Sequence, residues 1–405
     1  MRRTYKFRLY PTRKQTEKLN WTLETCRTLY NSCLVDRNRH YDETGKGLSR
    51  VNQQVILKMD KKILPYLKEI HSHVLQDVLF RVERAYNNFF RRVKEKAKTK
   101  EKAGYPRFKN YGRYDSITYT QSGYEIIDGK LKLSKIGSIK IKQHRSINGI
   151  IKTVNIKKES DKFYVCLSVL YKPAIKPIPV KQIGIDVGIK SFAVLSDGKV
   201  IDNPKYLINS EEKLISKQKE LSKKKKDSNN RRKTIKVVNR FHTKIKNKRK
   251  DFQHKVSRHI VDNYGYITVE GLQIKNMVQN HNLAKAINDA GWGQFISFLT
   301  YKAEEAGCYV EKVNPNYTSK MCSVCGYIYK DMDLSVREWT CPVCNTEHDR
   351  DINASINILN KTIRQELPEY TLGETGSMDD IVSSNAYALK SIPSSNQEAP
   401  QFIER

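Results

Sequence analysis

Two Cys-x-x-Cys pairs, separated by fifteen residues, constrain the fold of this 405-residue chain more than any other feature. Each pair supplies two sulfurs from a tight turn, and Gly326 after the first pair and Pro342 within the second are typical of such turns. A four-thiolate ribbon has this spacing, and we predict a Zn²⁺ site, with two redox pairs as the alternative, at Cys322, Cys325, Cys341 and Cys344. Because four sulfurs leave no open coordination position, this zinc is expected to be structural, and His348 nearby to be an ordinary polar residue.

The net charge indicates a polyanionic partner. The chain carries 75 Lys and Arg against 43 Asp and Glu, a formal charge of +32. Residues 211–260 alone hold 19 basic and 5 acidic side chains. A single lysine run is equally typical of a solvated helix face, but the excess over the whole chain exceeds what solubility needs. The composition therefore favours a protein that binds nucleic acid.

Hydrophobic patterning argues against a membrane protein. No apolar run approaches the roughly 18 residues of a membrane span, and the N-terminus lacks the apolar stretch of a secretory signal. We expect a soluble, cytoplasmic protein with no membrane partner. The four cysteines outside the two pairs stand among apolar neighbours and are predicted to be core residues: Cys26, Cys33, Cys166 and Cys308.

Acidic residues in apolar strands are the candidate catalytic groups. Asp186 lies between Ile185 and Val187, and Glu270 follows another short apolar run, so each charge would be costly there without a cation or hydrogen bonds. With a third acid, Asp351 or alternatively Asp349, they would form a carboxylate set suited to Mg²⁺ or Mn²⁺. Two such ions can activate water and stabilise the leaving oxygen of a phosphodiester. The sequence therefore predicts a metal-dependent nuclease.

The first half of the chain reads as a small β-structure with a helical insert. Residues 2–10 alternate as a strand, helical patterns follow to residue 96, and short strands separated by glycine turns occupy 104–172. In 74–93 an apolar helical face is predicted for Leu75, Val78, Leu79, Val82, Tyr86, Phe89, Phe90 and Val93. This pattern predicts a small β-barrel or sheet.

The second half has an α/β layout. Two buried strands within 183–195 precede two long helices, a strand at 266–269, an amphipathic helix and a strand at 308–313. The cysteine-rich segment interrupts this layout, and a last helix is predicted at 352–359. Beyond about residue 366 the chain is acidic and rich in Ser, Asn and Pro, which predicts a disordered tail.

Several motifs resemble the OrfB/TnpB proteins of insertion sequences, compact relatives of type V CRISPR effectors. They are Phe7-Arg8-Leu9-Tyr10-Pro11-Thr12, Tyr105-Pro106-Arg107-Phe108-Lys109, Ile183-Gly184-Ile185-Asp186-Val187-Gly188, Val269-Glu270-Gly271-Leu272, Asp289-Ala290-Gly291-Trp292-Gly293, the cysteine pairs, and Asp349-Arg350-Asp351-Ile352-Asn353-Ala354 with Asn357-Ile358. In the last motif the family usually has two alanines, where this chain has Ala354-Ser355.

The resemblance implies a domain plan and a function. It implies a wedge β-barrel at 1–10 and 104–175, a helical recognition domain at 11–103, an RNase-H-like (RuvC) nuclease domain at 181–315 and 346–365, a zinc ribbon at 316–345 and the tail at 366–405. The catalytic acids would be Asp186, Glu270 and Asp351, and a guide RNA from the transposon end would direct cleavage of double-stranded DNA beside a short adjacent motif. The alternatives are a transposase in the strict sense, or a guide-bound repressor without cleavage.

Three groups of residues are predicted to contact nucleic acid. The lysine run and the arginines after it suit phosphates: Lys223, Lys224, Lys225, Lys226, Arg231 and Arg232. Aromatic and basic residues interleave around Arg107, Phe108 and Lys109, where they would stack on RNA bases, although tyrosines there would also suit barrel packing. For the adjacent DNA motif the candidates are His73, Gln76, Thr118 and Gln121.

Overall fold

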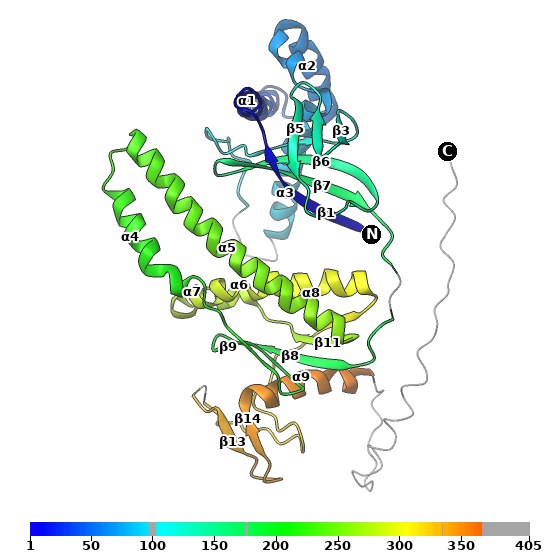
Figure 1. Ribbon diagram of the computed structural model, residues 1–405, viewed down its shortest axis with the longest axis vertical. Coiled ribbons are helices and arrows are strands. Elements are labelled where there is room, and N and C mark those ends of the chain that lie inside the picture. Colours follow the sequence, from blue (N-terminus) through cyan, green and yellow to red (C-terminus); the bar gives the residue numbers. More distant parts are fainter. Residues whose placement is uncertain (97–102, 175–176, 334, 367–405) are drawn as a thin grey trace. The chain divides into compact units, whose positions relative to one another are not determined.

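The computed structural model describes residues 1–96, 103–174, 177–333 and 335–366 (Figure 1). The chain divides into two compact units, which are described separately. The first unit comprises Met1–Lys181, Asn203–Gly265 and Ile274–Tyr309, and the second comprises Gln182–Asp202, Tyr266–Gln273 and Val310–Arg405. Apart from Glu366, the predicted tail lies outside the described residues. No helix in the described ranges combines the length and apolarity needed to cross a membrane.

The first unit contains a seven-stranded antiparallel sheet centred on the N-terminal strand. Strand β1 (Arg2–Tyr10) has the predicted bounds. The sheet order is β2-β6-β7-β1-β5-β4-β3, with β2 (Ser116–Tyr119), β3 (Tyr124–Ile127), β4 (Lys130–Leu133), β5 (Gly137–Lys142), β6 (Ile150–Glu159) and β7 (Lys162–Leu170). Asp128 and Gly129 both have positive φ, which makes the tight turn that joins β3 to β4.

The sheet curls without closing through main-chain pairing between the described strands. Its edge strands are β2 and β3. The Tyr119 hydroxyl at the end of β2 donates to the Ser134 carbonyl just after β4, at 3.1 Å, and the Tyr124 hydroxyl donates to the Ile151 carbonyl. The predicted small barrel is thus a curled sheet whose two ends are joined by side chains.

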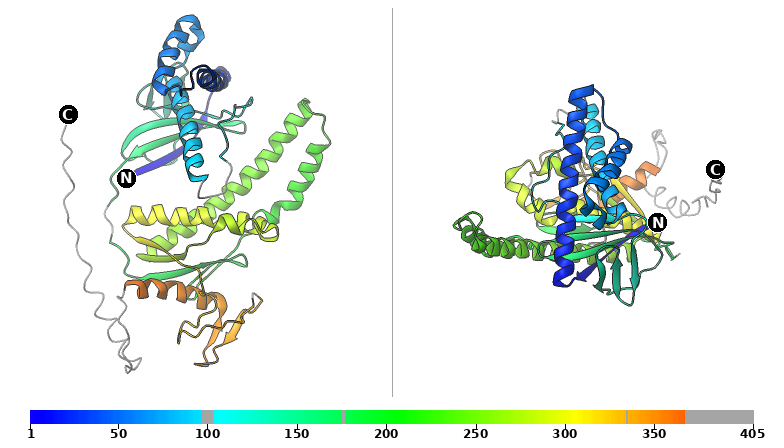
Figure 2. Two further views of the ribbon diagram at one scale, coloured as in Figure 1. Left: turned by 180° about the vertical axis from the view of Figure 1, so that it is seen from behind. Right: turned by 90° about the horizontal axis from the view of Figure 1, so that it is seen from above.

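Helices cover this sheet (Figure 2). They are α1 (Arg13–Thr44), α2 (Arg50–Ile63), the 3₁₀ turn η1 (Pro65–Glu69) and α3 (Ser72–Lys96). A capping box between Thr12 and Gln15 starts α1. The predicted face of α3 is buried through Tyr86, but Phe90 and Val93 are 53% and 44% exposed, so the prediction was wrong for those two. Core packing ends before the helical periodicity does.

The remaining helices of the first unit form a second layer. They are the turn η2 (Ile208–Ser210), α4 (Glu211–Ser222), α5 (Asn229–Asn263), α6 (Ile274–Met277), α7 (His281–Ala290) and α8 (Trp292–Ala306). The 35-residue α5 packs on α8. Buried Lys302 of α8 donates to the His254 carbonyl and the Ser257 hydroxyl of α5, which satisfies its ammonium group inside the interface.

The second unit is a five-stranded sheet with a helix on one face (Figure 1). Its order is β10-β9-β8-β11-β12, with β8 (Gln182–Val187), β9 (Ser191–Leu195), β10 (Val200–Asp202), β11 (Tyr266–Glu270) and β12 (Tyr309–Val313). Strand β11 runs parallel to β8, whereas β9 is antiparallel to β8. The hairpin β13 (Glu338–Thr340) and β14 (Glu347–Asp349) leads directly into α9 (Arg350–Glu366). The predicted strands and helices occur in the predicted order, and the structure adds β10, α6 and α7, which were not predicted.

Three of the four cysteines predicted to lie in the core, Cys26, Cys33 and Cys308, are buried, and Cys166 is half-buried.

Candidate active site and cysteine cluster

Asp186 and Glu270 are neighbours on parallel strands. Strands β8 and β11 pair Gly184 with Thr268 and Ile185 with Val269. The next pair in this register is Asp186 and Glu270, on strands that lie about 4.8 Å apart. Side chains alternate between the faces of a sheet, so both carboxylates share the face that carries Gly184 and Thr268.

Helix α9 covers the same face and brings a third acid to it. A Cβ on Gly184 would lie 2.1 Å from the Ser355 carbonyl oxygen, so the missing side chain permits this close approach. Further along, the buried hydroxyls of Thr268 and Thr362 are 3.1 Å apart. Asp351 lies in the first turn of α9. Ser355, the departure from the family's alanine pair, is fully buried and donates its hydroxyl to the Ile352 carbonyl within the helix.

The three carboxylates interact electrostatically. Burial, together with the charges of Glu270 and Asp351, raises the pKa of Asp186 to about 7, while Arg350 opposes the shift. Asp351 also pairs with Arg337 at 3.4 Å, on the side of the β13–β14 hairpin. Among the described residues, the four cysteines form a group placed to hold a metal ion, with ligand atoms within 4.8 Å of one another, whereas the three carboxylates do not form such a group.

Asp349 has a different role from Asp351. Its Oδ1 accepts the backbone N–H groups of Asp351 and Ile352, so it caps the N-terminus of α9. This engagement favours Asp351 as the third acid of the set.

Glu270 is buried and held by groups that the sequence did not single out. The Thr318 hydroxyl donates to Glu270 Oε1 at 2.5 Å. Burial raises the pKa of Glu270, while the Thr318 hydrogen bond and the charge of Lys361 oppose the rise. Thr318 gives no local signal, because nothing in its neighbourhood along the chain marks it as the partner of a residue 48 positions away.

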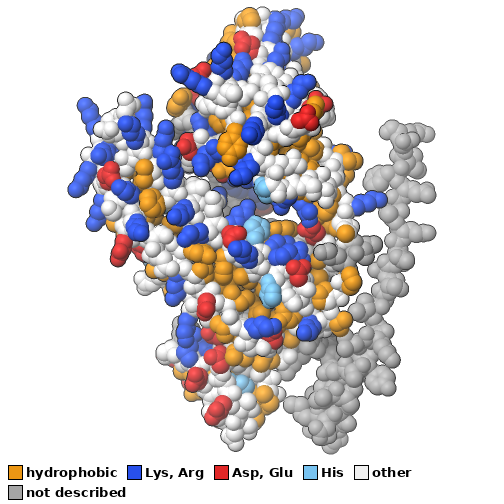
Figure 3. Space-filling model, viewed as in Figure 1, with side chains coloured by type: hydrophobic (Ala, Val, Ile, Leu, Met, Phe, Trp, Pro, Cys, Tyr) orange, Lys and Arg blue, Asp and Glu red, His pale blue; other side chains and the backbone are white. Residues whose placement is uncertain are grey.

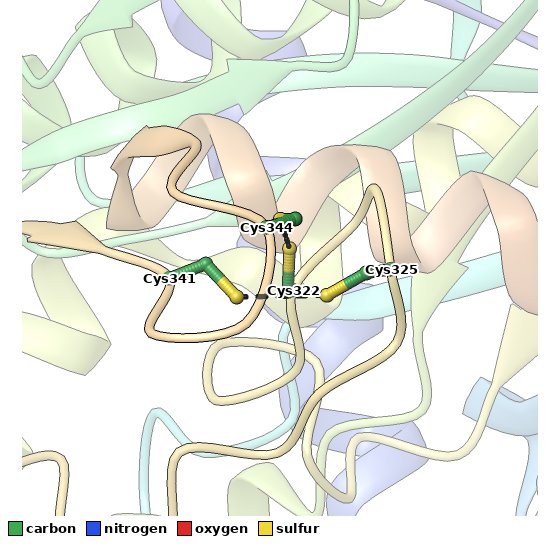
Figure 4. Close-up of side chains that lie close together, drawn as sticks. All are labelled: Cys322, Cys325, Cys341 and Cys344. Atoms are coloured by element: carbon green, nitrogen blue, oxygen red, sulfur yellow. Dashed lines mark hydrogen bonds between the residues drawn. The ribbon is translucent and has the colours of Figure 1, made fainter.

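The four cysteines form one compact cluster (Figure 4). The Sγ atoms of Cys322 and Cys344 are 3.6 Å apart, and those of Cys325 and Cys341 are 3.5 Å apart. Each pair is followed by a residue with positive φ, Gly326 after the first pair and Asn345 after the second. The backbone N–H of each donates to the first cysteine carbonyl of its pair, so both pairs form tight knuckles.

Polar side chains near the cluster contact its sulfurs. His348 is buried, its Nε2 lies 3.0 Å from Cys322 Sγ, and its ring lies 4.7 Å from that of Trp339. The prediction of an ordinary polar residue missed this contact. Hydrogen bonds from Thr346, together with those from Cys325 and Cys341, lower the pKa of the Cys344 thiol to about 6, which favours the thiolate at neutral pH.

Comparison with known proteins identifies the family. A protein of Streptomyces pristinaespiralis is 34% identical over 369 residues, covering 89% of each chain, and one of Escherichia coli K12 is 29% identical over 374 residues, covering 88% of this chain and 91% of its own. Both carry the name "Putative RNA-guided DNA endonuclease", the second with the addition InsQ. The chain belongs to the OrfB/TnpB family.

Three family models match parts of this OrfB/TnpB protein. They are OrfB_IS605, described as a probable transposase, at residues 164–281, a Cas12f1-like TNB domain at 292–358, and a helix-turn-helix domain at 1–46. In the last range the structure has one strand and one continuous helix, β1 and α1. The CRISPR-associated endodeoxyribonuclease Cas12f1 of Sulfoacidibacillus thermotolerans is 26% identical over 210 residues, about half of each chain.

The predicted phosphate contacts of this OrfB/TnpB protein lie at the turn between α4 and α5. Lys223, Lys225 and Lys226 are exposed and Lys224 is half-buried. Arg231 instead donates to the carbonyls of Leu221 and Lys224, so it holds the turn together, whereas Arg232 is exposed. Figure 3 shows Lys and Arg side chains spread over the α4–α5 arm.

The aromatic and basic stretch after residue 104 is divided between packing and exposure. Arg107, Phe108 and Lys109 are exposed, Phe108 by 54%. The backbone of Lys109 is fixed to α1, because its carbonyl accepts from Arg27 and its N–H donates to Asn31. The backbone here packs on α1 and the Arg107 and Phe108 side chains are exposed, so stacking on RNA bases stays a prediction.

The four candidates for the adjacent DNA motif come from α3 and from the end of β2. The His73 ring accepts from the Ser122 N–H at 3.3 Å, so the start of α3 lies beside the loop that contains exposed Gln121. Gln76 is half-buried. The Thr118 hydroxyl already accepts from Arg81 and Asn155, which leaves it less free to contact a base.

A basic groove between the sheet and α5 was missed by the sequence analysis. A cavity of about 680 Å³ is lined mainly by basic residues, and its lining includes Lys6, Arg8, Lys142, Lys157, Lys158, Lys246 and Lys250, with the carboxylates Asp115 and Glu159. Two further cavities share Ser160 and Thr243 with it. We call this surface the α5 groove. Its basic residues come from segments that are far apart in the sequence, so no local run of residues predicts the groove.

Proposed function

We propose that this protein is an RNA-guided, divalent-metal-dependent DNA endonuclease of an insertion sequence. Family membership and the names of its relatives support the class of activity. The observation that carries the metal-dependent mechanism is the register of β8 and β11, which makes Asp186 and Glu270 neighbours on the face covered by α9, with Asp351 in its first turn.

Asp186, Glu270 and Asp351 would hold Mg²⁺ or Mn²⁺. Carboxylate oxygens suit these hard cations, and the raised pKa of Asp186 reflects burial and repulsion that a bound cation would relieve. When bound, such ions activate water and stabilise the leaving oxygen of a phosphodiester. Asp186 and Glu270 supply the fixed strand-borne ligands, and Asp351 supplies a ligand that is paired with Arg337 here.

The cysteine cluster fits structural Zn²⁺. Zinc–sulfur bonds of about 2.3 Å place tetrahedral sulfurs about 3.8 Å apart, close to the 3.6 Å between Cys322 and Cys344 Sγ and the 3.5 Å between Cys325 and Cys341 Sγ. The four cysteines would hold zinc as thiolates, and Thr346 favours that form at Cys344. Zinc there would fix the two knuckles to each other without taking part in cleavage.

The α5 groove would grip a nucleic-acid backbone, with sequence selection left to base pairing with a transposon-end guide RNA. Arg8 Nη1 is buried in this unit without a hydrogen-bond partner among the described residues, which is costly unless a ligand oxygen supplies one. The Lys6 ammonium lies over the Tyr164 ring, 4.3 Å from the centroid of that ring. These features suit phosphates, and the sequence recognition beside the target would fall to the region of His73 and Gln121.

Purification from cells that carry the whole element tests the proposal. We expect a discrete RNA containing one transposon end to accompany the protein, and Mg²⁺-dependent cleavage of matching DNA. Asp186→Ala and Glu270→Ala should abolish cleavage with DNA binding nearly intact. RNA-free protein that joins DNA ends would instead favour a strict transposase, and unchanged repression by a cleavage-inactive complex would favour a repressor.

A further inference from the structure

Thr318 is positioned to fix one oxygen of Glu270. Its hydroxyl proton has two acceptors within reach, Glu270 Oε1 at 2.5 Å and the Pro315 carbonyl at 3.0 Å. The shorter, charge-assisted bond is the stronger of the two. Thr318 is 2% exposed and Glu270 is 8% exposed, so water competes poorly for this contact. The bond engages only one of the two carboxylate oxygens of Glu270.

Two asparagines of α9 hold the segment that begins at Thr318. Asn357 Nδ2 donates to the Thr318 carbonyl at 2.9 Å and to the Met321 carbonyl at 2.6 Å. Asn353 Nδ2 donates to the Met321 carbonyl at 2.7 Å, and its Oδ1 accepts the Ser323 N–H at 2.9 Å. Both asparagines are 1% exposed and stand four residues apart, on one face of α9.

The same segment contains the first cysteine of the cluster. Cys322 lies between Met321 and Ser323, whose backbone groups the asparagines bind, and its own N–H donates to the Tyr327 carbonyl in the first knuckle. Asp351 lies in the first turn of α9, two residues before Asn353. The segment therefore joins the cysteine cluster, Glu270 and the helix that bears Asp351.

We propose that residues 318–323 form a brace that sets the position of Glu270 relative to Asp351, with Thr318, Asn353 and Asn357 as positioning residues. This rests on the proposed function, since it assigns these residues to the carboxylate metal site. The cysteine cluster then has a second role: by closing the first knuckle it anchors the brace. Removing the zinc would disturb the carboxylate centre although none of its ligands is a cysteine.

Mn²⁺ binding to the full-length protein, followed by electron paramagnetic resonance of free Mn²⁺, tests the brace. Sites lost in Asp186→Ala define the carboxylate centre. At those sites Thr318→Val should weaken Mn²⁺ binding by about tenfold or more. Losses of this size are usual when a residue that hydrogen-bonds to a metal ligand is removed. Thr318→Ser keeps the hydroxyl and should restore most of the affinity.

A matched control separates positioning from packing. Thr362→Val removes another buried hydroxyl, 2% exposed, that pairs with Thr268 under the same helix and touches no carboxylate. We expect it to leave Mn²⁺ affinity within about twofold of the native value, because the Thr362 hydroxyl pairs with Thr268 and not with a metal ligand. Equal weakening by Thr318→Val and Thr362→Val, or native affinity in Thr318→Val, overturns the brace. If Asp186→Ala itself leaves every Mn²⁺ site intact, the proposed function fails instead.

The link to the cysteine cluster has its own readout. Asn357→Leu, which removes both hydrogen bonds from Asn357 to the segment, should weaken Mn²⁺ binding while zinc content stays equal to that of the native protein. Cys322→Ser should lose zinc and weaken Mn²⁺ binding together. A Cys322→Ser protein that has lost its zinc, remains folded by circular dichroism and binds Mn²⁺ with native affinity would show that the cluster does not anchor the brace.

Discussion

Asp349 Oδ1 accepts the backbone N–H of Asp351 at 2.9 Å and that of Ile352 at the same distance. Two acids only two residues apart are thereby given different tasks. One carboxylate satisfies free N–H groups at the start of α9, and the other pairs with the Arg337 guanidinium.

Amide substitutions should separate these tasks. Asn is as good an N-cap as Asp, so Asp349→Asn should change the melting temperature little and keep most of the cleavage activity. Asp351→Asn removes a charged metal ligand and should reduce cleavage by at least about a hundredfold. Asp349→Ala should cost about 1 kcal/mol of stability. Comparable losses of cleavage in the two Asn variants would contradict the division of roles.

Gly184→Ala should displace α9. The new Cβ would meet the Ser355 carbonyl oxygen at 2.1 Å and the Leu359 nitrogen at 2.8 Å, both backbone atoms that move only with the helix. Overpacking of this kind costs about 1 to 3 kcal/mol. We expect a lower melting temperature and a marked loss of cleavage, because Asp186 and Asp351 sit on the two elements that are forced apart.

Gly47→Ala is the matched control, since a Cβ there meets no atom within 4 Å. It should leave both melting temperature and cleavage unchanged. Normal cleavage by Gly184→Ala would mean that α9 need not contact β8 so closely.

The metal-free protein should become less stable as pH rises from about 4 to 7. Burial and neighbouring carboxylates raise the pKa of Asp186 to about 7 from 3.8, so the folded state holds a proton that the unfolded chain releases. Asp186→Asn imitates the protonated form. It should therefore raise the melting temperature at pH 8 and change it little near pH 4. The gain in the free energy of unfolding at pH 8 is at most about 4 kcal/mol.

Adding Mg²⁺ at pH 8 supplies the control. It should stabilise the native protein, because it binds the folded carboxylate site, and should have a smaller effect on Asp186→Asn. A melting temperature of Asp186→Asn that lies the same amount above the native value at pH 4 and at pH 8 would contradict the assigned pKa.

Buried charge made Asp186 and Glu270 predictable from sequence, because a carboxylate in an apolar strand requires a partner. Their register was not predictable, since sequence does not specify which strands pair. Thr318 and Asn353 were beyond reach for a related reason: their roles depend on acceptors in segments that tertiary folding brings together. The predicted apolar face of α3 shows the opposite error, because its periodicity continues to Val93 although Phe90 and Val93 are exposed.

Cys344→Ser should release zinc and lower the melting temperature. The thiolate is the metal ligand, and Thr346 already favours it at this position, so a serine hydroxyl is a poor replacement. Cys166→Ser is the control, because that half-buried cysteine lies in β7, outside the cluster, and should leave zinc content unchanged. Elemental analysis of the purified variants decides the matter, and native zinc content in Cys344→Ser would refute the ribbon.

Salt dependence should reveal the α5 groove as a phosphate site. Partial burial, together with the charges of Lys6 and Lys246, lowers the pKa of Lys250, and a phosphate would relieve that crowding. Neutralising one phosphate contact reduces the slope of log affinity against log salt by about 0.9 on duplex DNA and about 0.7 on a single strand. The double variant Lys246→Gln and Lys250→Gln should thus lose close to two contacts on whichever nucleic acid occupies the groove.

Lys58→Gln, on exposed α2 far along the chain, should leave the slope nearly unchanged. Filter binding of guide RNA and of target duplex, measured separately across a salt series, identifies the occupant, and slopes that match the native protein for both would remove the groove from the nucleic-acid interface.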